Sequence, residues 1–200
     1  MIKNVIFDIG NVLVNFRWKE YLVEKGFEPD IIKRIVKASV ASPYWDEFDR
    51  GVLSEDETMN LFIGLDPGIE KELHEAYDSI VGMITRRDDA IPWVKSLKAA
   101  GYNVYYLSNF SEKAYNECRD TLDFMDYMDG GIMSFREHVI KPDKAIYTML
   151  LERYNLVADE CAFIDDTERN IVAANQLGIH GIIHNSYEET SEELKKLGVC

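Results

Sequence analysis

Cysteine is scarce in this sequence, and long apolar runs are missing from it. The 200 residues contain three cysteines, Cys118, Cys161 and Cys200. An odd number without the paired spacing of a zinc site argues against a disulfide framework or a cysteine-bound metal, so we interpret each as a buried or incidental thiol. No apolar run reaches the roughly 20 residues of a membrane-spanning helix, and Met1–Asp8 is unlike a signal peptide. These absences predict a cytoplasmic protein without a membrane partner.

Basic residues are also few. Lys and Arg number 22 against 36 Asp and Glu, which gives a formal net charge of −14. Nucleic acids and anionic membranes bind basic surfaces, so neither is expected as a partner. A small phosphorylated molecule stays compatible with an acidic chain if one pocket gathers cations, backbone amides and a metal ion. Apolar residues make up 46% of the chain, which is enough for one core, or for a core with a smaller inserted domain.

Short apolar runs alternate with helical patterns over much of the chain. Strands are predicted over residues 3–7, 103–107 and 161–164, and more weakly over 181–183 and 131–133. Between them, apolar residues at helical spacing predict helices that end at Gly101, follow Pro142 and begin at Thr167. Alternation of this kind is typical of a parallel sheet with helices on both faces. We therefore predict an α/β fold with a three-layer, Rossmann-like core.

Residues 16–89 break the alternation. We find no convincing strand among them; the apolar spacing instead predicts about four helices, one of which begins with a capping box formed by Ser54 and Glu57. The chain is therefore expected to have a core built from residues 1–15 and 90–200, with a helical block, 16–89, inserted after the first strand.

Polar side chains follow three of the predicted strands. Asp8 ends the first, Ser108 and Asn109 follow the second, and Asp165 and Asp166 follow the third. Ligands of open parallel sheets bind at the carboxyl ends of the strands, so these groups should meet there.

Lys141, before a proline at a helix start, should join them. Carboxylate oxygens suit Mg²⁺. A carboxylate can attack phosphorus to form an aspartyl phosphate, with a lysine offsetting the charge.

Four motifs then resemble those of the haloacid dehalogenase superfamily, in order and over essentially the whole chain. The segment Phe7–Leu13 is similar to the first motif, whose leading aspartate is the nucleophile. Leu107–Asn109 resembles the phosphate-binding second motif, and Lys141–Pro142 the third. Phe163–Asp166, followed by Asn170, resembles the acidic metal-binding fourth motif. Each motif alone is weak, but four in this order are specific.

The resemblance implies a magnesium-dependent phosphatase acting on a small phosphorylated metabolite. Asp8 and Lys141 would be catalytic, and Ser108, Asn109, Lys141 and Asn11 would bind phosphate. The metal would be held by Asp8, the Gly10 carbonyl and Asp166, with Asp165 acting through water or as a supporting group. The helical block would be the cap that selects substrates, and Tyr44, Trp45, Asp46, Phe48 and Asp49 are its candidate contacts.

Gly10 departs from the usual pattern. Phosphatases of this superfamily carry an aspartate there, which protonates the leaving oxygen and later accepts a proton from water. Such acid–base help is worth roughly 10²–10⁴ in rate. We therefore expect either a substrate with a less basic leaving oxygen, such as a sugar 1-phosphate, or another group that supplies the proton. The segment Asp8–Val12 in fact resembles a bacterial branch that includes an α-D-glucose-1-phosphate phosphatase.

Two rival functions stay open at this point. One is a 2-haloacid dehalogenase, which needs no metal; the pair of acids Asp165 and Asp166 argues against it. The other is a phosphate-binding protein that lost turnover together with the acid at position 10. The sequence leaves the oligomeric state open between a monomer and a homodimer.

Overall fold

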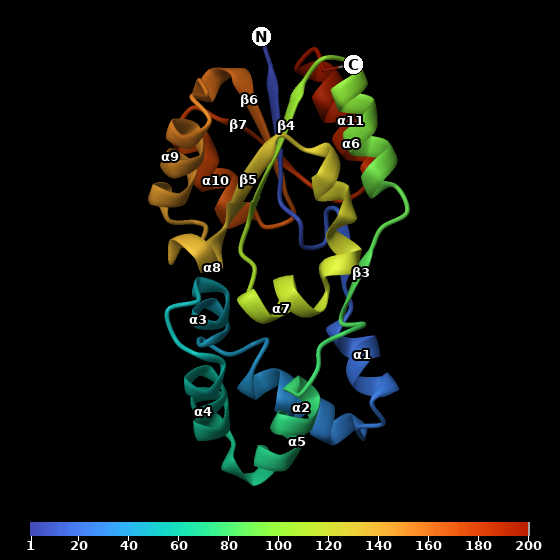
Figure 1. Ribbon diagram of the computed structural model, residues 1–200, viewed down its shortest axis with the longest axis vertical. Helices are drawn as coiled ribbons and strands as arrows, with labels where there is room; N and C mark the ends of the chain where they lie inside the picture. The colour runs from blue at the N-terminus through green and yellow to red at the C-terminus, as the bar shows by residue number, and fades with distance from the viewer. Residues whose placement is uncertain (200) are drawn as a thin grey trace.

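The computed structural model describes residues 1–199, and it is built around a five-stranded parallel sheet (Figure 1). The strand order is β5-β4-β1-β6-β7, so β1 lies at the centre. The strands are β1 (Asn4–Phe7), β4 (Asn103–Ser108), β5 (Gly130–Met133), β6 (Cys161–Asp165) and β7 (His180–Ile183). All five predicted strands of the sheet are confirmed, with ends shifted by about one residue. The α/β fold is therefore as the sequence predicts.

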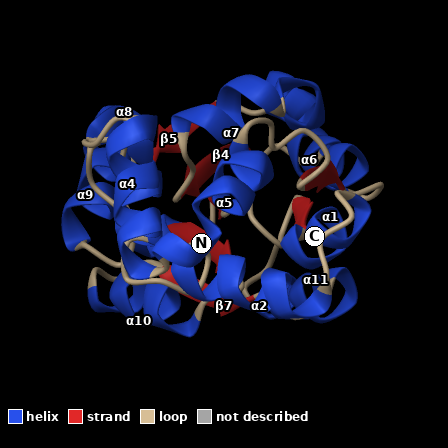
Figure 2. Cartoon of the chain, turned by 90° about the horizontal axis from the view of Figure 1, so that it is seen from below, coloured by secondary structure: helices blue, strands red, loops and turns tan. Residues whose placement is uncertain are grey.

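Alternate residues of the strands enter two different cores, which makes three layers. Phe7 of β1 packs on one side with residues of α6 (Ala90–Ala99) and α11 (Tyr187–Lys196). Ile6, its neighbour, packs on the other side with residues of α9 (Lys144–Arg153) and α10 (Glu168–Gln176). Figure 2 shows the two pairs of helices on opposite sides of the strands. Strands buried on both faces explain the continuous apolar runs of the sequence.

The inserted segment is more helical than predicted. It contains α1 (Trp18–Glu24), α2 (Pro29–Ala38), α3 (Trp45–Arg50), α4 (Glu55–Leu65), the 3₁₀ turn η1 (Pro67–Ile69) and α5 (Glu70–Tyr77). The structure thus has five α-helices where about four were predicted. Helices α2, α4 and α5 lie at the end of the molecule away from the two chain termini (Figure 1). The boundaries of this unit as a separate cap, 16–89, remain a prediction.

The prediction that residues 16–89 contain no strand is wrong. Strand β3 (Ile84–Arg86) pairs antiparallel with β2 (Val14–Phe16), and the register joins Val14 to Arg86. The two strands are the two chain crossings between the sheet and the inserted helices. Three residues are too few to establish an alternating pattern in a sequence, which is why β3 was missed.

Local signals for helix ends are mostly confirmed. Ser54 and Glu57 form the predicted capping box of α4, and Gly101 follows α6 with a φ of +92°. Thr167 immediately precedes α10, but its side chain makes no capping hydrogen bond and donates to Asp166 instead.

The remaining helical elements of the core are α7 (Glu112–Glu117), η2 (Arg119–Tyr127), α8 (Ser134–Glu137) and η3 (Ala158–Glu160). Cys118 and Cys161 are buried free thiols, as interpreted from the sequence; Cys200 lies outside the described residues. Among the helices of residues 1–199, none is both long and apolar enough to cross a membrane.

Candidate active site

The carboxyl ends of three adjacent strands bring the predicted reactive groups together. Asp8 follows β1, and β1 pairs on one side with β4, which ends at Ser108, and on the other with β6, which ends at Asp165. The backbone N–H of Asp8 donates to the carbonyl of Ile164 at 2.8 Å, which holds the residue at the edge of β6. The position of Asp8 is therefore fixed by the sheet.

One oxygen of Asp8 is held by two neighbours. Oδ1 accepts a hydrogen bond from the Ser108 hydroxyl at 2.7 Å and forms an ion pair with Lys141 Nζ at 2.8 Å. The other oxygen, Oδ2, lies on the side of Gly10, where a methyl carbon added to the glycine would stand 3.9 Å away from it. Burial raises the pKa of Asp8 to about 7, with Lys141 lowering it and Asp165 raising it.

Lys141 is a buried cation between two carboxylates. Its ammonium is 2.8 Å from Asp8 and 2.6 Å from Asp165, and its side chain is 1% exposed. Burial opposes its charge, but Asp8 and Asp165 raise the pKa of Lys141 above its ordinary value. Asn109 fixes the lysine backbone by accepting from its N–H at 2.7 Å and donating to its carbonyl at 3.0 Å. Lys141 is therefore held in place both at its ammonium group and at its backbone.

The two adjacent acids have different surroundings. Asp165 is fully buried and accepts hydrogen bonds from the Asn170 amide and the backbone N–H of Thr167, besides its ion pair with Lys141. Asp166 is half-buried, lines the cavity and accepts from the Asn11 amide at 2.9 Å. Asp166 is therefore the acid with an accessible carboxylate, and Asp165 supports the lysine.

These acids have the composition of a divalent metal site. Three carboxylate oxygens, one each from Asp8, Asp165 and Asp166, lie within 4.8 Å of one another. The cluster has three carboxylates and one ammonium, so it carries an excess of negative charge when all are ionised. Oxygen donors and excess negative charge are what Mg²⁺ requires. The residues present therefore fit this ion.

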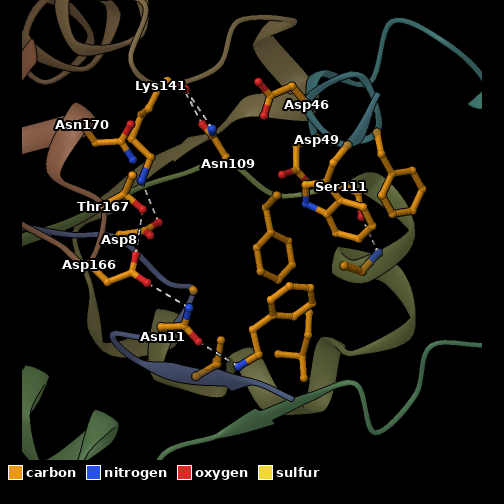
Figure 3. A pocket seen from close by; sticks show the side chains of 18 of the residues that line it. Asp8, Asn11, Asp46, Asp49, Asn109, Ser111, Lys141, Asp166, Thr167 and Asn170 are labelled. Carbon is orange, nitrogen blue, oxygen red and sulfur yellow. Dashed lines mark hydrogen bonds and ion pairs between the residues drawn. The ribbon is translucent and has the colours of Figure 1, made fainter. Parts of the chain in front are cut away.

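A cavity of about 230 Å³ opens beside the acids (Figure 3). Its core side includes Asp8, Gly10, Asn11, Asn109, Lys141, Asp166, Thr167, Arg169 and Asn170. Its far wall includes Asp46 and Asp49 of α3 (Figure 3). Apolar side chains also line the cavity, namely Trp45 and Phe48 of α3 with Phe16, Ile80, Met83, Ile84 and Phe110. The inserted segment thus contributes a large part of the lining.

Most predicted site residues gather around this cavity. Asp8, Gly10, Asn11, Asn109, Lys141 and Asp166 line it directly, while Ser108 and Asp165 lie behind them, fully buried. Of the five candidate contacts in the inserted segment, four line the cavity and Tyr44 does not. Sequence reasoning missed the apolar lining outside α3, because Ile80, Met83 and Phe110 carry no motif and only the tertiary structure brings them there.

The fold and the site together define the class of protein. It is an α/β protein with a central parallel sheet, a lysine-bridged carboxylate cluster at the carboxyl edge of that sheet, and helices of an insert facing the cluster. A family model for haloacid dehalogenase-like hydrolases matches residues 2–178. The chain belongs to this family of hydrolases.

Individual relatives are similar over nearly the full chain. A sesquiterpene phosphatase from Aspergillus oryzae is 27% identical over 99% of this chain and 97% of its own length. A D-ribitol-5-phosphate phosphatase from Bacteroides thetaiotaomicron is 26% identical over 89% of both chains. A haloacid dehalogenase family enzyme from Bacteroides thetaiotaomicron, solved with magnesium and inorganic phosphate, superposes with a TM-score of 0.72 at 22% identity, covering 96% of this chain and 99% of its own.

Proposed function

We propose that this protein is a magnesium-dependent phosphatase that hydrolyses a small phosphate monoester through a phosphorylated Asp8. The observation that carries the proposal is the state of the Asp8 carboxylate. One oxygen is held by Ser108 and Lys141, and the residue lines a cavity beside Asp166. A carboxylate fixed in this way is oriented for attack on a group bound in the cavity.

The chain's own residues supply the steps. An Asp8 oxygen attacks phosphorus, and the leaving oxygen departs toward the side away from Asp8, as in-line displacement requires. Lys141 offsets the negative charge of Asp8 and of the transferring group. Asn109 keeps the lysine backbone in place through its two hydrogen bonds. Water then attacks the phosphorylated Asp8 and releases phosphate.

Mg²⁺ would be held by Asp8, Asp166 and the carbonyl of Gly10, with Asp165 supporting, and it would supply Lewis-acid stabilisation of the phosphoryl oxygens. Asn11 fits a supporting role here, since its amide donates to Asp166 and its side-chain oxygen accepts from the Phe16 N–H at 3.3 Å. The names of the phosphatase relatives support phosphate-ester chemistry over the displacement of halide from carbon.

The substrate class is limited by the far wall of the cavity. Phe16, Trp45 and Phe48 present apolar and aromatic surface there, while Asp46, Asp49, Ser111 and Arg169 are the polar groups nearby. We infer a monoester whose organic part packs on aromatic side chains. A sugar 1-phosphate, as predicted from Gly10, meets this requirement because its sugar ring can stack on an aromatic ring. The phosphate ester of an apolar alcohol meets it because its apolar part can be buried there.

A turnover assay with a panel of sugar phosphates, aryl phosphates and prenyl phosphates tests the proposal. Phosphate release should require Mg²⁺, stop with EDTA and continue over many turnovers. Asp8→Asn should lower it by roughly 10⁴-fold or more, whereas Asp30→Asn, at an exposed surface position, should not change it. Activity that survives Asp8→Asn would contradict the proposal. Halide release that persists in EDTA would identify a dehalogenase. Binding of a phosphate ester without release of phosphate over many turnovers would identify a binding protein.

A further inference from the structure

Beside Asp8, at the position of the usual acid, the sequence has Gly10. A methyl carbon added to Gly10 would meet only Asp8 Oδ2, at 3.9 Å, and no other heavy atom of the described chain outside its chain neighbours within 4 Å. The space around a β-carbon at this position is therefore open. A proton for the leaving oxygen has to come from another part of the cavity.

The leaving oxygen faces the inserted helices. In an in-line displacement the leaving group departs on the side of phosphorus opposite to the nucleophile. Asp8 is part of the core side of the cavity, so the leaving oxygen points toward the wall that α3 provides. In Figure 3, Asp49 of α3 lies across the cavity from Asp8, with its carboxyl directed into the open space.

Asp49 is held there by the core. The Ser134 hydroxyl of α8 donates to the Asp49 carbonyl at 2.5 Å and accepts from the Phe110 N–H at 2.9 Å. One residue further, a ring nitrogen of His138 lies 3.2 Å from the carbonyl of Arg50. These contacts tie the end of α3 to the loop that follows β4, which also carries Asn109. The backbone at Asp49 is thus fixed relative to the core.

Gly51 allows this close approach. It ends α3 with a φ of +67°, and a methyl carbon added to it would lie 2.9 Å from the backbone of Phe135. Only glycine adopts this backbone shape without strain and leaves room for α8. The last turn of α3 therefore packs directly on the core.

We propose that Asp49 is the proton donor to the leaving oxygen, in place of the acid absent at Gly10; this rests on the proposed phosphatase function. As the bond between phosphorus and the leaving oxygen breaks, its electron pair stays on that oxygen, which takes the proton of the Asp49 carboxyl and leaves as an alcohol. In the second step a water oxygen bonds to phosphorus and its proton returns to Asp49. The bond from phosphorus to Asp8 then breaks, and both carboxyl groups are restored.

The electrostatics of the cavity support a protonated Asp49. Asp49 is half-buried on the cavity wall. Its partial removal from water, followed by the charges of Asp46 and Asp8, raises the pKa of Asp49 to about 8, against a smaller opposite effect of Lys141. Arg169 of α10 also lines the cavity and pairs with Asp46 at 3.7 Å. A carboxyl with this pKa carries a proton near neutral pH and can release it to a developing alkoxide.

A leaving-group series tests the proposal with Asp49→Asn, which has the same shape but no acid proton. The substrates are p-nitrophenyl, phenyl and alkyl phosphates, in order of increasing basicity of the leaving oxygen. Asp49→Asn should lose roughly 10²–10⁴ in turnover on alkyl phosphates and less than about 10-fold on p-nitrophenyl phosphate, which needs no proton. Asp49→Glu should recover part of the alkyl activity. Asp30→Asn, at an exposed position that does not line the cavity, should leave the rates on all three substrates unchanged.

A second measurement does not depend on turnover. The infrared spectrum of the wild type near neutral pH should contain a band from a protonated carboxyl that is missing in Asp49→Asn. Equal losses on all substrates, or no loss, in Asp49→Asn would overturn the role of Asp49. A wild type that releases phosphate from none of the three substrates would instead overturn the phosphatase function itself.

Discussion

At the scale of single residues, the chemistry of the site depends on which carboxyl groups have an ion-pair or hydrogen-bond partner. Asp165 has Lys141, Asn170 and the Thr167 N–H as partners, and it is fully buried. Asp49, on the cavity wall, has no ion-pair partner within residues 1–199, and burial raises its pKa to about 8. Neighbouring environments thus separate a carboxylate that is paired with a lysine from a carboxyl whose pKa is raised.

Gly10→Asp should supply, from the core side of the cavity, the proton donor that is missing in Asp49→Asn. Gly10 is not among the residues with positive φ, and an added β-carbon meets only Asp8 Oδ2 at 3.9 Å, so the backbone and the β-carbon tolerate the substitution. In the Asp49→Asn background, Gly10→Asp should raise alkyl phosphate turnover by about 10-fold or more. In the wild type it should change that turnover by less than about threefold, because a donor is already present. Gly10→Ala in the Asp49→Asn background is the control, and equal rescue by alanine would contradict an acid role.

The pKa of Asp49 also predicts a pH-dependent stability. Its pKa is about 8 in the folded protein and 3.8 ordinarily, so the folded state binds the proton more tightly. That contribution to stability is complete below about pH 3.8 and is lost as the pH rises to about 8. Asparagine at position 49 cannot ionise, so Asp49→Asn does not lose stability in this way as the pH rises. Without metal, the free energy of unfolding of Asp49→Asn should therefore exceed that of the wild type at about pH 9 by on the order of 1–3 kcal/mol.

Thermal unfolding at about pH 5 and about pH 9 measures this effect. The difference in Tm between Asp49→Asn and the wild type should grow by several degrees, in favour of the variant, between the two pH values. Asp30→Asn removes one acid from an exposed position and serves to subtract the general effect of net charge. An advantage of Asp49→Asn that is the same at both pH values would contradict the raised pKa.

At the scale of elements, α3 is a contact between the inserted helices and the core. Its six residues place Trp45 and Phe48 against Phe62 of α4 and Tyr77 of α5, in one aromatic cluster. Its last turn is fixed to α8 by Ser134 and Gly51. The same short helix therefore packs in the insert, lines the cavity and carries Asp49, so its position affects binding and chemistry together.

Gly51→Ala tests the close contact between α3 and α8. The added methyl group meets the Phe135 backbone at 2.9 Å and adopts an unfavourable φ of +67°. We expect a loss of about 1–3 kcal/mol in the free energy of unfolding and, because Asp49 shifts, a lower turnover of alkyl phosphates.

Gly26→Ala is the matched control for this variant. Gly26 also has a positive φ, +86°, but nothing lies within 4 Å of an added carbon, so its substitution should produce the backbone strain alone and leave the turnover unchanged. Equal effects of the two variants on stability and turnover would contradict a special contact at Gly51.

At the scale of the whole molecule, an acidic chain concentrates cations where phosphate would bind. The net charge is −14, yet the cavity contains the buried Lys141 and the exposed Arg169. Beneath them three acids lie within 4.8 Å. These acids repel one another in the folded protein, and a divalent cation bound among them would relieve that repulsion. Metal binding and the stability of the fold should therefore be linked.

Mg²⁺ should raise the Tm of the wild type without any substrate. At about 100 times its Kd the ion adds about 2.7 kcal/mol, which corresponds to about 5–10 °C for a protein of this size. Asp166→Asn removes an accessible carboxylate and should abolish most of this increase, while Asp30→Asn should keep it. Potassium chloride at equal ionic strength separates specific binding from screening. An equal increase in Asp166→Asn would contradict a metal site at these acids.

The sequence by itself determined the sheet and the reactive groups at its edge. Buried strands leave continuous apolar runs, and the polar residues that end them, such as Asp8 and Asp165, stand out by contrast. The parallel topology then requires that they meet, so their convergence followed from local pattern alone.

The tertiary structure alone decided which residues outside α3 complete the lining of the cavity, and it alone decided the short strand β3. Phe16, Ile80 and Phe110 are far apart in the chain and match no motif, and their neighbourhood comes from how the inserted helices pack on the core. Asp49 was a candidate contact in the sequence, but its proton depends on burial and on the nearby charges of Asp46 and Asp8. A pKa is set by what surrounds a group in space, and that information is absent from the order of residues along the chain.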